Sequence, residues 1–275
     1  MNFKYTIFLS GMTVLVSFLI LNSMTYQPSF AATEYEHKTK WGEKGVAIGQ
    51  FNQITGVAVD SENNIYVADM TGRSNMIQKF TDNGSFILGF GVFGNGPEFF
   101  TNPTGLAVDS ENNIYVADFG NPTYAIKKFS KDGKFINTFG SFGLGDGEFI
   151  TPGGLGVDKE NNIYATDFGE NNNIQKFDQN GNFIMKFGTY GTDDGQFNNP
   201  IEIAIDSSDT LFITDDKNNR VQVFNSDGGY ITQFGNQGSA SEIIQDPIGI
   251  AVDSSGNVYV GDGRDSDLHV FSPVK

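Results

Sequence analysis

The chain of 275 residues carries 33 acidic and 17 basic side chains, a formal net charge of -16 at pH 7, and no cysteine. A surface of this charge repels phosphate polyanions, so the composition argues against a nucleic-acid partner. The absence of cysteine excludes disulfides and thiol nucleophiles, so packing and strand ladders must stabilise the fold. The length suits a single domain of up to about 250 residues.

The first 31 residues have the three-part form of a secretory signal peptide. Lys4 precedes an apolar run at 7–21, and Ser29 and Ala31 supply the small residues of a cleavage site. The run is shorter than the about 20 residues that usually span a bilayer. We expect cleavage after Ala31 and a secreted or cell-surface protein with no membrane span, and an uncleaved membrane anchor is the alternative. Cleavage would leave 16 basic and 33 acidic residues, a net charge of -17.

A stretch of fourteen residues recurs five times and organises the rest of the sequence. The copies read GVAVDSENNIYVAD (56–69), GLAVDSENNIYVAD (105–118), GLGVDKENNIYATD (154–167), EIAIDSSDTLFITD (202–215) and GIAVDSSGNVYVGD (249–262). Their first aspartates are 49, 49, 48 and 47 residues apart, a period typical of propellers and solenoids. Each copy predicts a β-hairpin, because two apolar strands flank a turn-forming run. We expect the first Asp to cap that run through an Asx-turn.

Each hairpin is followed by two more predicted strands. The third strand always ends in phenylalanine, at Phe80, Phe129, Phe177, Phe224 and Phe271. A tight turn such as Asp132-Gly133 follows, in which glycine adopts the positive φ of a hairpin reversal. The fourth strand is predicted at 86–90, 135–139, 183–187 and 230–234. The unit is therefore a four-stranded antiparallel meander.

A glycine-rich linker joins each unit to the next and carries one apolar residue in a fixed slot. The slot is filled by Phe51, Phe100, Phe149, Phe197 and Ile244. We expect these side chains to plug the space between neighbouring units rather than to stack on a ligand, because the slot recurs in every linker.

The two ends of the chain predict how the units close. The C-terminal unit stops at Phe271-Ser272-Pro273, before a fourth strand, while Trp41-Gly42 is in phase with Phe90-Gly91. We expect residues 34–42 to supply the missing strand, which would remove open sheet edges. The prediction is an all-β propeller over 33–275, with five blades at about 54–91, 103–140, 152–188, 200–235 and 247–271 plus 34–42.

The repeat resembles the NHL repeat. That family's pattern of a G-I-A-V-D strand, a turn, N-I-Y-V-A-D and then N-x-R-V-Q-V-F is matched closely by 247–262 and 215–224. The resemblance extends over about 41–271 and implies a β-propeller. Because NHL repeats usually build six-bladed propellers, a six-bladed arrangement is the alternative to five blades.

An aspartate ends the second strand of every unit. These residues are Asp69, Asp118, Asp167, Asp215 and Asp262. In a propeller they lie on the face that carries the linkers, around the central channel. A ring of carboxylates can bind Ca²⁺ where several converge, and this is the one cofactor that the sequence suggests. In the other interpretation each Asp caps its own loop.

Similar propellers that are enzymes provide a contrast. The peptidyl-hydroxyglycine amidating lyases hold zinc with several histidines, and this chain has only His37 and His269. The gluconolactonase-like propellers use a carboxylate-rich metal centre, which the Asp ring leaves open. RNA-binding NHL domains present a basic face, whereas Arg220 alone matches the family's Arg slot here. We therefore expect no nucleic-acid partner, and no catalytic residue is assigned.

The leading prediction is a monomeric, non-catalytic binding module. The loops vary between units while the strands do not, so the loop face is expected to bind a protein, peptide or glycan. The candidate contact residues are Met70, Arg73, Phe119, Tyr124, Phe168, Arg220 and Arg264. Phe93, Phe142 and Tyr190 recur as an aromatic residue in three linkers and serve either the ligand or the fold. The alternative function is a metal-dependent hydrolase or lyase that uses the Asp ring.

Overall fold

The strands of the repeat form where the sequence predicts them. The computed structural model describes residues 40–70, 76–236, 238, 243–264 and 266–273. The main strands are β3 (Ile54–Val59), β4 (Ile65–Asp69), β5 (Met76–Phe80), β6 (Phe86–Phe90), β7 (Pro103–Val108), β8 (Ile114–Asp118), β9 (Ala125–Phe129), β10 (Phe135–Phe139), β13 (Pro152–Val157), β14 (Ile163–Asp167), β15 (Asn173–Phe177), β16 (Phe183–Phe187), β17 (Pro200–Ile205), β18 (Leu211–Asp215), β19 (Arg220–Phe224), β20 (Tyr230–Phe234), β21 (Pro247–Val252), β22 (Val258–Asp262) and β23 (Asp267–Phe271).

The linkers contain short elements of their own. These are the two-residue strands β1 (Glu43–Lys44), β2 (Gln50–Phe51), β11 (Ser141–Phe142) and β12 (Glu148–Phe149). In the part of the chain that the structure describes, one 3-10 turn, η1 (Asp216–Asn218), follows β18 in the loop that leads to β19. In the described ranges no helix has the length and apolar character needed to cross a membrane.

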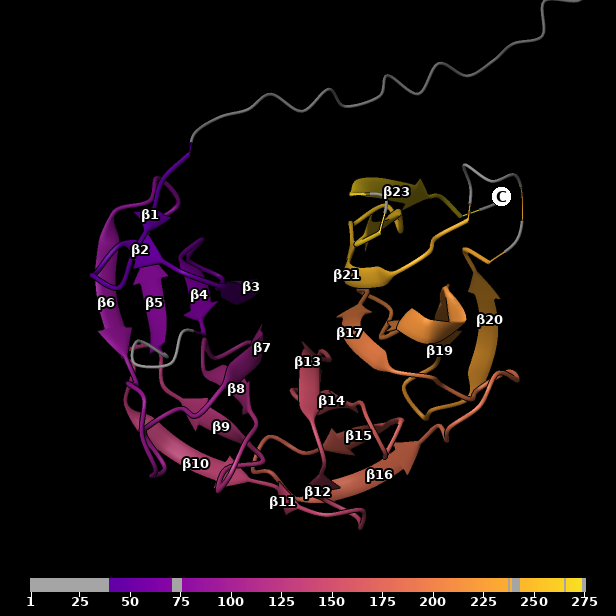
Figure 1. The fold of residues 1–275 in the computed structure, drawn as a ribbon, viewed down its shortest axis with the longest axis horizontal. Helices are drawn as coiled ribbons and strands as arrows, with labels where there is room; N and C mark the ends of the chain where they lie inside the picture. The colour runs from indigo at the N-terminus through magenta and orange to yellow at the C-terminus, as the bar shows by residue number, and fades with distance from the viewer. Residues whose placement is uncertain (1–39, 71–75, 237, 239–242, 265, 274–275) are drawn as a thin grey trace, which may run out of the picture. The chain divides into compact units, whose positions relative to one another are not determined.

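The main strands assemble into five antiparallel blades (Figure 1). Four blades have four strands, in the orders β3-β4-β5-β6, β7-β8-β9-β10, β13-β14-β15-β16 and β17-β18-β19-β20. The fifth blade has three described strands, β21-β22-β23. The all-β propeller with five blades is therefore confirmed.

The turn between the first and second strands of each blade is held by its aspartate. Asp60 Oδ1 accepts the backbone N–H groups of Glu62 at 3.0 Å and Asn64 at 2.8 Å. Its Oδ2 accepts the hydroxyl of Tyr66 at 3.1 Å and lies 3.2 Å from Nζ of Lys79. The two backbone hydrogen bonds recur at Asp109, Asp158, Asp206 and Asp253. The predicted Asx-turn is confirmed in every blade.

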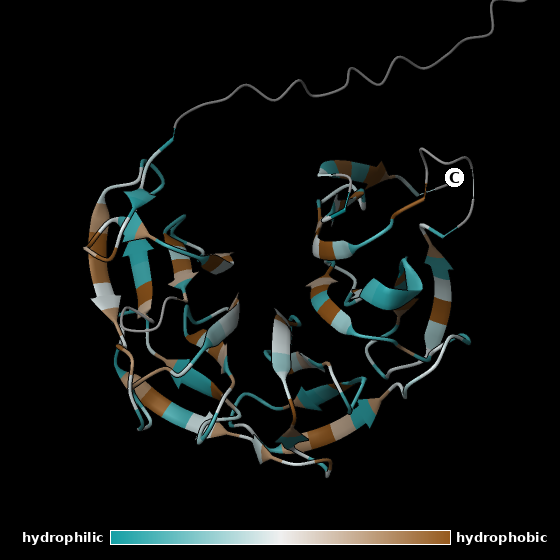
Figure 2. Cartoon of the chain, in the orientation of Figure 1, coloured by the Kyte–Doolittle hydropathy of each residue, from teal (hydrophilic) through white to brown (hydrophobic). Residues whose placement is uncertain are grey.

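Neighbouring blades pack through their innermost strands. β3 lies against β7, β7 against β13, β13 against β17, and β17 against β21. Glycine permits this close approach, because a Cβ on Gly105 would lie 2.3 Å from the carbonyl oxygen of Gly153 in the next blade. Apolar and polar residues alternate within the strands (Figure 2), and the buried apolar side chains form clusters that lie between blades.

Aromatic side chains join blades 1 to 4 to the linkers that enter them. The ring of Phe129 in β9 lies 4.9 Å from Phe90 of the preceding blade and 5.5 Å from Phe100 in the linker. The slot residues Phe100, Phe149, Phe197 and Ile244 are fully buried, and Phe51 is 9% exposed. Their predicted role as plugs between units is confirmed.

Trp41 occupies the position that its phase predicts. Its ring lies 4.6 Å from that of Phe80, much as Phe90 lies 4.9 Å from Phe129. Most of the predicted closing strand, at 34–39, falls outside the described residues, as does the predicted signal peptide. The pairing of that strand with β23 and the cleavage after Ala31 both stay predictions.

The first and last blades each carry apolar side chains whose counterparts elsewhere are buried. Val57 in β3 is 57% exposed, whereas Leu106 at the same position of β7 is 8% exposed. Leu268 in β23 is 62% exposed, whereas Ile77 in β5 is fully buried. Leu106 packs in one cluster with residues of the preceding blade, and Ile77 packs there with residues of the following blade. Among the described residues, Val57 and Leu268 lack such cover.

Candidate ligand-binding face

The linkers and the loops after the second strands lie together, and we call this surface the loop face. The ring of Tyr124, in the β8–β9 loop, contacts Phe142 in the linker that follows its blade, at 4.8 Å between centroids. The side-chain amide of Asn171 donates to the carbonyl of Gly143 at 3.2 Å, and that of Asn218 donates to the carbonyl of Gly191 at 2.9 Å. The loop face is thus built from segments far apart in the sequence.

The aspartates that end the second strands are buried beneath this face and hold the linkers. Asp118 Oδ1 accepts the backbone N–H groups of Thr101 at 2.9 Å and Asn102 at 2.7 Å. The same role belongs to Asp69, Asp167, Asp215 and Asp262, which accept from linker N–H groups at equivalent positions. Each carboxylate therefore ties the end of a linker to the blade that follows it.

The surroundings of these carboxylates differ between blades. Asp118 lies 2.8 Å from Nζ of Lys127, and Asp215 lies 2.7 Å from Nε of Arg220. Burial still raises the pKa of both carboxyls above the ordinary value, although these cations oppose the shift. At Asp167 burial outweighs the hydrogen bonds that the carboxyl accepts and raises its pKa to about 6.

A second set of buried polar side chains, on the third strands, was given no role by the sequence. Gln78 Oε1 accepts the N–H of Gly49 at 2.8 Å, and its Nε2 donates to the carbonyl of Gln50 at 3.0 Å. Gln175 and Gln222 bind their own linkers in the same way. A signal for this role was present, since a polar residue recurs at the centre of each third strand.

The structure does not gather the five aspartates at one point. Among the described residues, the group of three or more imidazole or carboxylate ligands within 4.8 Å of one another is Asp262, Asp267 and His269. Only one member of the predicted ring belongs to this group. Calcium binding by the ring therefore stays a prediction, and the observed contacts agree with the capping interpretation.

The other predicted contact residues lie at different depths. Arg220 is 3% exposed, and it donates to the linker carbonyls of Asp193 at 2.9 Å and Gln196 at 2.7 Å, so its guanidinium is occupied within the fold. Arg264 is exposed. Met70, Phe119 and Phe168, each directly after a buried aspartate, are half-buried. Arg73 lies outside the described residues.

Three aromatic residues are prominent on the linkers. Phe93, Phe142 and Tyr190 are 51%, 63% and 68% exposed. Their bridge partners are the buried plugs Phe100, Phe149 and Phe197. One position of each linker pair thus fills the space between blades, while the other presents an aromatic ring to solvent.

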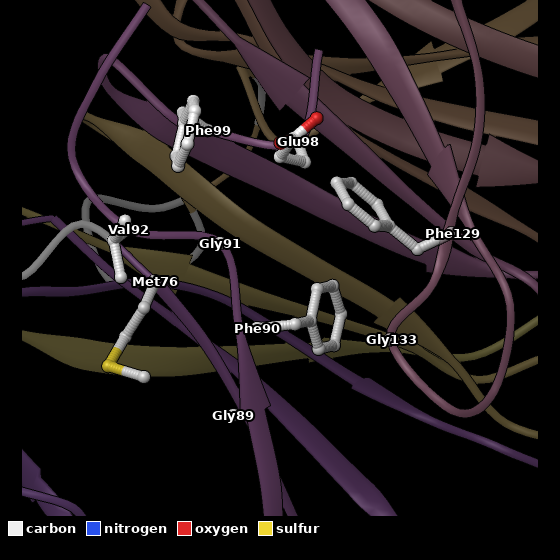
Figure 3. A pocket seen from close by; sticks show the side chains of 9 residues that line it. All are labelled: Met76, Gly89, Phe90, Gly91, Val92, Glu98, Phe99, Phe129 and Gly133. Atoms are coloured by element: carbon white, nitrogen blue, oxygen red, sulfur yellow. The ribbon is translucent and has the colours of Figure 1, made fainter. Parts of the chain in front are cut away.

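A hollow of about 240 Å³ lies at the border of the first two blades (Figure 3). Its lining includes Met76, Val92, Glu98 and Phe99. The hollow depends on Gly89, where a Cβ would come within 2.7 Å of the Met76 methyl group. The next three blades carry Thr138, Lys186 and Gln233 at this position. This is a shallow apolar recess with one acidic group, and Val92 in its lining directly precedes the exposed Phe93 in the chain.

Comparison with family models identifies the repeat. The NHL repeat model matches residues 51–80, 100–129 and 197–224, and a model described as a β-propeller repeat matches 229–261. Each of the three NHL matches runs from a linker plug to the last residue of a third strand, and the other match extends from β20 to β22. The chain is an NHL-repeat β-propeller. No curated protein matches the sequence of this NHL propeller.

Solved structures share the fold of this NHL propeller at low sequence identity. A catalytically inactive virginiamycin B lyase from Staphylococcus aureus, solved with quinupristin, is 16% identical, with a TM-score of 0.57 over 81% of this chain and 70% of the lyase chain. A chain of the nidogen/laminin complex is 19% identical, with a TM-score of 0.57 over 80% of each chain. A protein of unknown function from Bacteroides caccae is 12% identical, with a TM-score of 0.59 over 80% of this chain and 78% of its own.

Proposed function

We propose that this NHL propeller is a secreted or cell-surface binding module that recognises a protein, peptide or glycan through its loop face. The observation that carries the proposal is the exposure of the aromatic rings of Phe93, Phe142 and Tyr190. Exposed aromatic rings suit binding, because they bury a large area with little loss of side-chain entropy. A net charge of -16 argues against a nucleic-acid ligand.

The occupied polar groups beneath the loop face support binding rather than catalysis. Asp118 uses its carboxylate on linker N–H groups and on Lys127, and Arg220 uses its guanidinium on linker carbonyls. Groups held in this way make the loop face rigid, and a rigid surface loses little entropy when it binds a ligand. We propose that the monomer is sufficient for binding.

The experiment is to screen the mature chain on a glycan microarray and against a displayed peptide library, and then to measure affinity for the hits. The variant with Phe93→Ala, Phe142→Ala and Tyr190→Ala is expected to bind at least about tenfold more weakly, because aromatic hot spots commonly contribute more than about 1 kcal/mol each. The matched control removes Ile136, Ile184 and Ile231, which are 49%, 48% and 54% exposed on the outermost strands. The proposal would be contradicted if both variants lost binding equally, or if neither variant lost binding.

The alternative function is a metal-dependent hydrolase or lyase that uses the Asp ring with Ca²⁺. It is tested by thermal unfolding with and without calcium. A rise in melting temperature that Asp118→Asn combined with Asp167→Asn abolishes would favour this alternative over the binding module.

A further inference from the structure

Three potential metal ligands meet on the last hairpin of the chain. Asp262 ends β22 and lies directly opposite Asp267, which begins β23. His269 follows two residues later on β23, so its side chain lies on the same face of the strand as that of Asp267. Side chains of directly paired residues also share a face, so strand register brings all three together.

The separations suit a shared cation better than direct hydrogen bonds. His269 Nε2 lies 3.3 Å from Asp267 Oδ1 and 3.7 Å from Asp262 Oδ2. Both distances exceed the about 2.7–3.2 Å of an N–H···O hydrogen bond. Ligand atoms arranged tetrahedrally around Zn²⁺ at about 2.1 Å are roughly 3.4 Å apart, close to the observed values.

The composition of this site departs from the other four blades at two positions. The residues opposite the strand-ending aspartate elsewhere are Met76, Ala125, Asn173 and Arg220. Only blade 5 of the described blades places a second carboxylate there, and like charges directly opposite each other in a sheet are destabilising. At the position of His269, the other blades carry Gln78, Lys127, Gln175 and Gln222.

The first carboxylate of the site is already oriented by the backbone. Asp262 Oδ2 accepts the N–H of Gln245 at 2.7 Å, and Oδ1 accepts the N–H of Arg264 at 2.9 Å. Hydrogen bonds of this kind fix ligand carboxylates in metal sites. Its side chain is fully buried, whereas that of Asp267 is 60% exposed, so the site has one anchored ligand and one side open to solvent.

We propose that Asp262, Asp267 and His269 bind a first-row divalent cation, with water completing the coordination. One imidazole and two carboxylates form a mixed set that suits Zn²⁺ or Mn²⁺ better than Ca²⁺, which takes 6–8 oxygen ligands. The cation offsets the repulsion between the two facing carboxylates. This site differs from the predicted Asp ring, with which it shares only Asp262, and it lies outside the aromatic surface proposed to bind the ligand.

The test is titration of the full mature chain with ZnCl₂ at pH 7.5 by calorimetry, with CaCl₂ titrated in parallel. The variants are His269→Gln and Asp267→Asn, because blade 3 carries Gln175 and Asn173 at these positions and folds with them. The control is His37→Gln, which removes the other histidine of the chain.

We expect one zinc site in the unmodified chain and in the His37→Gln control. Each of the two site variants should weaken zinc binding at least about tenfold, the lower end of what loss of supporting groups alone costs a metal site. Circular dichroism of each variant separates a lost site from a lost fold. Absence of zinc binding in the unmodified chain would overturn the proposal. Unchanged zinc affinity in His269→Gln, or tighter binding of calcium than of zinc, would overturn it as well.

Discussion

At the scale of single residues, each repeat uses two aspartates for two different tasks. Asp158 closes a surface turn by accepting the N–H groups of Glu160 and Asn162. Asp167, at the end of the same hairpin, is fully buried and accepts two linker N–H groups. Burial penalises the charged form of the second aspartate, which is why its pKa is raised to about 6.

The raised pKa of Asp167 predicts a specific pH dependence of stability. The pKa of Asp167 is about 3.9 in the unfolded chain and about 6 in the folded protein. Between these two pH values the native state therefore holds more protons than the unfolded chain. The contribution of Asp167 to the free energy of unfolding should therefore be fully favourable below pH 4 and decline as the pH rises to 6. Urea denaturation of the unmodified chain and of Asp167→Asn at several pH values measures this decline.

The matched control for that experiment is Glu111→Gln, which changes an exposed acid on a turn. Subtracting the unfolding free energies of Asp167→Asn from those of the unmodified chain should leave a difference that falls between pH 4 and 6. The same subtraction for Glu111→Gln should be flat. A flat difference for Asp167→Asn would show that this carboxyl titrates normally in the folded protein.

At the scale of elements, the linkers behave as parts of the core rather than as loose connections. The linkers into blades 1 to 4 are each held at three points: a buried aromatic plug, a polar side chain of the third strand and the strand-ending aspartate. In the linker before blade 3 these are Phe149, Gln175 and Asp167. Because the same linker also exposes Phe142, one segment separates the stabilising role from the proposed binding role.

We therefore expect Phe149→Ala and Phe142→Ala to have opposite effects on stability. Phe149 is fully buried, so its truncation should lower the free energy of unfolding by about 3–5 kcal/mol. Phe142 is 63% exposed, so its truncation should change stability by no more than about 0.5 kcal/mol. Denaturant unfolding of both variants is the measurement. Similar losses in the two variants would place Phe142 in the fold and weaken the case for a ligand contact.

At the scale of the whole molecule, the described blades leave one strand of the fifth blade to be supplied. Trp41 packs on Phe80 as the last residue of a fourth strand would, and β23 is the last described strand of its sheet. Residues 34–39 lead directly into Trp41, and their predicted pairing with β23 would place position 37 opposite Phe271, in the register of Phe86 with Phe80. The predicted strand would join the N-terminal and C-terminal ends of the domain.

Removal of this strand is predicted to destabilise the domain strongly. A chain that begins at Gly45 lacks Trp41, whose half-buried ring contributes up to about 3 kcal/mol, and it also leaves an open strand edge that favours aggregation. We expect it to melt well below a chain that begins at Thr33, by differential scanning calorimetry. Cysteines introduced at positions 37 and 271 should form a crosslink under oxidising conditions. Equal melting temperatures together with no crosslink would mean that the fifth blade is completed in another way.

The architecture could be predicted from the sequence because the features that determine it are local or periodic. Strands, turns and their order follow from alternating apolar residues, from Asp60 and its equivalents, and from a period of 47 to 49 residues. The plugs were found because the slot recurs in all five linkers. Phase alone also predicted that Trp41 is equivalent to Phe90, and the packing of Trp41 on Phe80 agrees with that.

Tertiary structure decided which of these residues are available to a ligand. Phe142 and Phe149 are the same residue type in one linker, yet one is exposed and the other buried, because only one side of the linker faces the next blade. The sequence suggested that Arg220 is a surface cation, but its guanidinium is enclosed by carbonyl groups of the linker that enters its blade. The group of Asp262, Asp267 and His269 was likewise invisible in the sequence. Phase along a chain determines which strand a residue occupies, whereas burial and coordination depend on distances between strands, and only the packed structure determines those.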